Sequence, residues 1–155
     1  VPGDKAREMH PAVVKLGAQY ATGCISGASA RAVALVETMI QVISDFSLSS
    51  DRDRESKDLR RELDKEVKRC VQFVIDCRAM AIPMGNFIRF LRTQILNLPG
   101  DIMEHDAKQK IVNEMREYME TKLNTPHQSI IRTGSERAIS ANDVVLIVGR
   151  SYLVE

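Results

Sequence analysis

Apolar residues recur every three or four positions along most of the chain, the spacing that places them on one face of an α-helix. The first such stripe is Val13, Leu16 and Tyr20, and it follows Pro11, which suits the first turn of a helix. A second helix is predicted over residues 29–47, where two apolar stripes cover much of the circumference. A helix of that kind is expected at the centre of a bundle.

The most charged part of the chain, residues 51–69, has fifteen charged residues in nineteen, eight of them basic and seven acidic. Leu59, Leu63 and Val67 run through it as a single apolar stripe. The pattern predicts a long helix with one buried edge and a solvated remainder. The alternative is a charged surface that faces a protein partner. Because the signs alternate, nothing here favours a nucleic acid.

The second half of the chain predicts further helices at about 84–97 and 101–124, with the sequence Asn124-Thr125-Pro126 ending or kinking the latter. Residues 127–139 suggest one more helix. Residues 143–149 form an apolar run without polar alternation, which is typical of a strand covered on both faces in an α/β sheet. We therefore expect a mainly α fold, a bundle of about five or six helices, cut from a longer protein at the first strand of an α/β domain.

Composition narrows the class of protein further. The chain has 22 Lys and Arg against 21 Asp and Glu, so it lacks the basic excess of a nucleic-acid or membrane-surface module. Its 44% hydrophobic content argues against disorder, and no apolar run is long enough for a membrane span. Cys24, Cys70 and Cys77 are odd in number and widely spaced, which predicts free, buried thiols in a reducing compartment.

No reaction centre can be assembled from the residues. His10, His105 and His127 have no second His or Cys at ligand spacing, so no metal site is expected. No set of Ser, His and an acid has sequence support, and we expect no catalytic residue and no cofactor. Gly149, after the predicted strand, is a weak signal for a phosphate loop.

Three stretches nevertheless resemble a known family: residues 10–20 with 25–35, residues 77–86, and residues 143–149. Together they are similar to the regulatory subunits of eukaryotic translation initiation factor 2B, and to the delta rather than the alpha or beta type. The resemblance covers residues 10–155. It implies a leader (1–9), an N-terminal helical domain (10–140) and the start of a Rossmann-like domain (141–155).

The resemblance also implies a function. In this family the alpha, beta and delta subunits form the regulatory core of a cytosolic decamer that exchanges guanine nucleotide on initiation factor 2. Catalysis belongs to the gamma and epsilon subunits, so this chain is not expected to be an enzyme. The core senses phosphorylation of the alpha subunit of initiation factor 2, as part of the integrated stress response. No cofactor, direct nucleic-acid contact or membrane is implied.

Partner-binding residues follow from the resemblance position by position. Arg61, on the charged helix, matches a basic residue that contacts the alpha subunit of initiation factor 2. A guanidinium there could bind oxygen groups in a fork geometry, or could simply be solvated. Thr121 and Thr125 match the end of the same surface, where related subunits carry an acid and a leucine.

Distant relatives supply an alternative function. Isomerases of methylthioribose-1-phosphate and ribose-1,5-bisphosphate share this fold, and two loops of their helical domains lie near the sugar phosphate. Ser26-Gly27-Ala28 with Arg31, and Cys77-Arg78-Ala79, lie at comparable places, but both loop patterns are degraded here. A polar packing cluster under the domain junction is expected instead, formed by Ser26, Arg31, Arg78 and Asn86. A helical oligomerisation scaffold is the third hypothesis.

Overall fold

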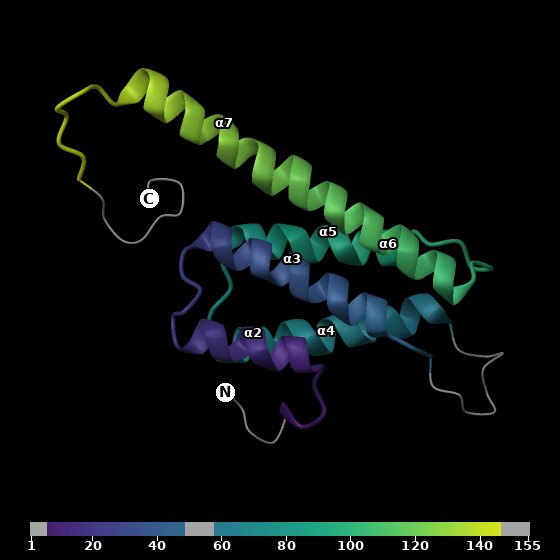
Figure 1. Cartoon of the computed structure of the whole chain (residues 1–155). Coiled ribbons are helices and arrows are strands. Elements are labelled where there is room, and N and C mark those ends of the chain that lie inside the picture. The colour runs from purple at the N-terminus through teal and green to yellow at the C-terminus, as the bar shows by residue number, and fades with distance from the viewer. Residues whose placement is uncertain (1–5, 49–57, 147–155) are drawn as a thin grey trace.

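The computed structural model of the chain describes residues 6–48 and 58–146, and the described part is built of helices (Figure 1). They are α2 (Pro11–Ala21), α3 (Ala28–Asp45), α4 (Leu59–Cys77), α5 (Ile82–Leu96) and α6 (Glu104–Tyr118), followed by η2, α7 and η3. In Figure 1, α2 and α4 lie on one side, α3 and α5 occupy the middle, and α6 crosses the other side. The predicted helical bundle is confirmed.

Helix α3 forms the centre of this bundle because two of its faces are apolar. Leu35, Val36, Met39 and Ile43 are all fully buried, and the helix packs against α2, α5 and α6. The two stripes seen in the sequence therefore meet different neighbours. This arrangement puts every layer of the bundle in contact with one central helix.

The charged helix α4 buries a single edge, as its pattern predicts. Asp58 caps its first turn by accepting the N–H of Arg60 at 3.0 Å. Leu59, Leu63 and Val67 are buried against the bundle. Most of the charged side chains between them face solvent or lie at the margin of the core.

The end of the chain forms one long helical rod, which differs from the sequence prediction. The π-helical segment η2 (Met119–Asn124) follows α6 directly, and α7 (Thr125–Thr133) and η3 (Gly134–Ala138) continue it. Pro126 does not end the rod, because the wider turn of η2 comes just before it. In that turn Thr125 donates its N–H to Glu120, five residues back.

The predicted strand at 143–149 is not confirmed. Residues 143–146 have no regular structure, and residues 147–149 lie outside the described residues. A strand needs a neighbour to pair its backbone groups, and a single apolar run cannot supply one. Of the three cysteines, all free, Cys70 is buried and Cys77 half-buried, whereas Cys24 is exposed against expectation.

Candidate functional site

Arg61 lies in the first turn of α4 with its side chain exposed. Its neighbour Arg60 forms an ion pair with Asp58, Nη2 to Oδ2, at 2.9 Å. Within the described residues, Arg61 itself forms no ion pair, so its guanidinium is available to a partner. Asp58 lies beside both arginines; hydrogen bonding to Arg60 is the main cause of the lowered pKa of Asp58.

Thr121 and Thr125 lie on the exposed surface of the rod, at η2 and the first residue of α7. Each turn of the rod carries them away from Arg61. A Cβ on Gly100, in the turn before α6, would lie 3.9 Å from Nη2 of Arg60. Thr121 lies roughly 25 Å along the rod from Glu104, the first residue of α6, at 1.5 Å per residue. The structure therefore does not bring the three residues into one compact site.

A second group of predicted residues does meet, around Tyr20 of α2. Arg31, in the second turn of α3, is only 7% exposed. Its guanidinium carbon lies 4.9 Å from the centroid of the Tyr20 ring, and its Nη2 donates to the carbonyl of Ala79. The Tyr20 hydroxyl in turn donates to the carbonyl of Arg31. These contacts tie α2, α3 and the α4–α5 loop together.

Arg78 joins this cluster, but the other two predicted members do not. Its Nη1 donates to the carbonyl of Tyr20 at 3.4 Å. Among the described residues, no hydrogen bond links Ser26 or Asn86 to either arginine. The expected four-residue cluster is thus an arginine pair around a tyrosine. The sequence shows Tyr20 only as part of an apolar stripe, so periodicity gives no sign of the role of its hydroxyl.

The electrostatics of the arginine pair are unusual. Burial is the main reason why the pKa of Arg31 is lowered, and the positive charge of Arg78 adds to it. Burial likewise raises the pKa of Tyr20. The Nε of Arg31 is buried and has no hydrogen-bond partner among the described residues. A buried charge without a carboxylate is costly, and in the described part of the chain the contacts that offset this cost are the Tyr20 ring and the carbonyl of Ala79.

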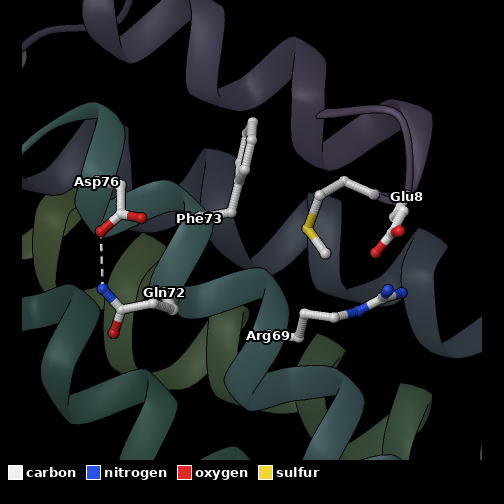
Figure 2. Close-up of a pocket in the computed structure, with 6 residues that line it drawn as sticks. Glu8, Arg69, Gln72, Phe73 and Asp76 are labelled. Carbon is white, nitrogen blue, oxygen red and sulfur yellow. Dashed lines mark hydrogen bonds between the residues drawn. The ribbon is translucent and has the colours of Figure 1, made fainter. Parts of the chain in front are cut away.

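A hollow of about 250 Å³ lies between the residues just before α2 and helix α4. Figure 2 shows its lining: Phe73 rises toward α2, and the guanidinium of Arg69 turns toward Glu8. Gln72 donates to Asp76 at 2.7 Å on its rim. No sequence motif marks this hollow, because its residues come from segments about sixty positions apart.

Two structural findings bear on other kinds of site. Over residues 6–48 and 58–146, no three His, Cys, Asp or Glu side chains are grouped so that they could hold a metal ion. In the same part of the chain, no helix has the length and apolar character to cross a membrane.

Comparison with known proteins gives the class of protein. The sequence pattern of the initiation factor 2 subunit family, IF-2B, matches residues 24–155, and the chain belongs to this family. The expected resemblance to its delta members is also confirmed. The chain is 32% identical over 147 residues to translation initiation factor eIF2B subunit delta of Dictyostelium discoideum. It is 28% identical over 140 residues to the Schizosaccharomyces pombe subunit of that name.

These matches cover 95% and 90% of this chain but only 22% and 29% of the relatives, so the chain spans less than a third of their length. The fold resembles that of eIF2B delta from Chaetomium thermophilum, with a TM-score of 0.81, 23% identity, and coverage of 94% of this chain and 52% of that one. It also resembles a chain of the tetrameric eIF2B-beta2-delta2 complex from that organism, with a TM-score of 0.82 and 23% identity. That second match covers 94% of this chain and 45% of the other.

Proposed function

We propose that this chain is the helical part of a delta-type regulatory subunit of the exchange factor initiation factor 2B. The observation that carries the proposal is the family match over residues 24–155, on a bundle that resembles solved delta chains. It would assemble with the alpha, beta, gamma and epsilon subunits in the cytosol. Its role would be regulatory and not catalytic, without direct contact to nucleic acid or membrane.

The proposed regulation is the sensing of phosphorylation on the alpha subunit of initiation factor 2, within the integrated stress response. The guanidinium of Arg61 is exposed and forms no ion pair with any residue that the structure describes, which supports a contact on α4. Thr121 and Thr125 are exposed on the rod and suit a contact as well. Because these positions lie far apart, they would belong to a broad surface or to two different contacts.

The proposed domain division is a leader at 1–9, a helical domain at 10–140 and the start of a Rossmann-like domain at 141–155. Helix α7 supports this division, because none of its residues is buried. Ile130 and Ile131 are exposed on it, Met80 is exposed in the loop before α5, and Ile82 is exposed at the first residue of α5. A second domain that follows the rod would cover such apolar side chains.

The test is binding of the phosphorylated alpha subunit to a reconstituted exchange factor that carries Arg61→Glu in the full-length chain. Reversing one interface charge should weaken binding about tenfold, or 1.4 kcal/mol. Arg89→Glu, at an exposed position of α5, is the matched control and should bind like the wild type. If Arg61→Glu binds equally well, the α4 contact is wrong.

The arginine pair favours a second candidate function, the binding of a sugar phosphate as in the isomerase relatives. Arg31 is buried, its Nε has no hydrogen-bond partner over residues 6–48 and 58–146, and Arg78 contacts the same tyrosine. Ribose 5-phosphate should then raise the melting temperature of the full-length chain, because it binds only the folded state. Arg78→Ala should abolish the shift. An unchanged melting temperature at millimolar ribose 5-phosphate would reject this candidate. If the chain assembles with the other subunits but neither senses phosphorylation nor binds a sugar phosphate, the hypothesis of a helical oligomerisation scaffold is the one that remains.

A further inference from the structure

The first turn of α2 depends on His10 for its backbone hydrogen bonds. Pro11, the first residue of the helix, has no N–H that needs a partner. The carbonyl of His10 accepts the N–H groups of Val13 and Val14 at 2.9 and 3.2 Å. The N–H of Ala12 donates to Nδ1 of the His10 ring, also at 3.2 Å. The imidazole is therefore the N-cap of this helix.

The other nitrogen of the His10 ring faces α3. Nε2 lies 3.1 Å from Oδ2 of Asp45, the last residue of α3. Because Nδ1 accepts a hydrogen bond, it carries no proton, and the single proton of the neutral ring lies on Nε2 and is donated to Asp45. One neutral side chain thus begins α2 and joins it to the end of α3.

Protonation of the His10 ring removes the cap. An imidazolium has an N–H at both nitrogens and no free lone pair, so Nδ1 can no longer accept from Ala12. Two donors would then face each other at 3.2 Å, with a positive charge at the positive end of the helix dipole. Ala12 is half-buried, so its N–H would lose its partner where access to water is limited.

The charges around the His10 ring do not replace the lost cap. The charged side chains that share a hollow with it come from three segments: Arg7 and Glu8 before α2, Asp45 of α3, and Glu66 and Arg69 of α4. Glu66 and Arg69 are paired with each other, Oε2 to Nη2, at 2.9 Å. Asp45 favours the imidazolium, but its side chain is 66% exposed and accepts from Nε2 in both charge states. A stronger pair with Asp45 leaves the N–H of Ala12 without an acceptor.

We propose that His10 is a pH-sensitive latch at the start of α2, closed while its ring is neutral and opened when the ring takes up a proton. Opening would fray the first turn of α2 and loosen residues 6–9, of which Ala6 and Met9 pack against the core. A histidine suits this role because its charge changes between about pH 5 and 8. Mild acidification would thereby free one wall of the hollow that Met9 shares with Phe73 and Arg69 (Figure 2).

The experiment is hydrogen–deuterium exchange, followed by mass spectrometry, on the full-length chain at about pH 7.5 and about pH 5.5. Each rate is divided by the intrinsic rate at the same pH, which gives a protection factor. In the first turn of α2 this factor should fall about fivefold at the lower pH. His10→Asn is the matched variant: the Asn side-chain oxygen also caps but does not titrate, so its protection should be equal at both pH values. His10→Ala should have low protection at both.

Two further measurements separate the latch from general destabilisation in acid. The first turn of α4 is capped by Asp58, whose pKa is lowered, so it should keep its protection at both pH values. Asp45→Asn should retain the pH response of α2, because the response comes from the cap and not from the ion pair. The proposal is overturned if the first turn of α2 keeps its protection in acid or if α4 loses protection equally. A response of His10→Asn that equals the wild type, or its loss in Asp45→Asn, overturns it as well.

Discussion

At the scale of single residues, Asp64 is the acid that joins α4 to α5. Its Oδ1 accepts from Nε of Arg92 at 2.7 Å, and its Oδ2 lies 2.7 Å from Nζ of Lys68. Its side chain is 14% exposed. The hydrogen bond from Arg92 is the main cause of the lowered pKa of Asp64.

This pKa predicts a pH dependence of stability. The folded-state pKa lies below the unfolded-state value of about 3.9, so the ion pairs contribute fully above that value. Their contribution is lost as the pH falls through the lower folded-state pKa. Asp64→Asn should lower the free energy of unfolding at neutral pH by about 1–2 kcal/mol, because its partners are partly exposed. Urea unfolding at neutral pH and near pH 3 measures it.

The control for Asp64 is Asp101→Asn, at an exposed position in the turn before α6. It should keep the wild-type loss of stability in acid. If Asp64→Asn and the wild type show the same pH dependence, the two ion pairs do not stabilise the fold.

The cysteines give a second prediction at this scale. Burial raises the pKa of the Cys70 thiol to about 12 and also raises the pKa of Cys77, whereas Cys24 is exposed. The thiolate is the reactive form, so Ellman's reagent in mildly alkaline buffer should label Cys24 quickly, Cys77 more slowly and Cys70 only after unfolding. Cys24→Ser should remove the fast phase. Fast labelling of Cys70 in the folded chain would contradict the packing.

At the scale of the elements, the close approach of α2 and α4 depends on Gly17. A Cβ at that position would lie 2.8 Å from Sγ of Cys77 and 2.8 Å from Cε1 of Phe73. No side chain fits there without movement of α4 or of both neighbours. Helices α5 and α6 instead pack through aromatic rings: the centroids of Phe87 and Phe90 lie 5.5 and 4.6 Å from that of Tyr118.

Gly17→Ala should therefore destabilise the domain by about 1–3 kcal/mol through overpacking. The expected direction opposes helix propensity, which favours Ala over Gly by roughly 1 kcal/mol. Ala21→Gly, at the exposed end of the same helix, is the matched control and should cost only that propensity difference. Thermal melting followed by circular dichroism measures both. A Gly17→Ala domain as stable as the wild type would show that the helices separate at little cost.

At the scale of the whole molecule, the rod carries an apolar stripe beyond the bundle. Leu123 is buried, but Ile130 is 54% exposed and Ile131 37% exposed on the next turns. Figure 1 shows α7 extending past the ends of α3 and α5. An exposed apolar stripe of this kind marks an interaction surface or promotes association.

We predict that the 155-residue chain self-associates through this stripe, and that Ile130→Ser with Ile131→Ser shifts it toward monomer. The melting temperature should change little, since folding of the chain does not bury these side chains fully. Sedimentation velocity over a range of concentrations measures the association. Glu117→Ser, exposed on α6, controls for surface substitution. A wild-type chain that stays monomeric would show that the exposed isoleucines do not associate.

Much of this architecture could be predicted from local pattern. The sequence shows the apolar stripes of α2, α3 and α4, and the single buried edge of the charged helix α4, as apolar residues at regular spacing. This spacing arises because the buried face of a helix recurs every three or four residues. Only the ends fail. Pro126 lies within the helical rod, because the wider π turn just before it accommodates the proline. The apolar run at 143–149 forms no strand over residues 143–146, because a strand must pair with another segment and the local sequence does not show whether one is present.

The sequence by itself determined the helices, their buried faces and the family. These features depend on the spacing of nearby residues and on short motifs, which the order of residues in the chain shows directly. Only the tertiary structure decided which side chains meet. It brought Arg31 and Arg78 to Tyr20, and it built the hollow beside Arg69 from two segments about sixty positions apart. The physical reason is that such neighbours are set by how helices pack, through contacts between residues tens of positions apart, which leave no periodic signal in the chain.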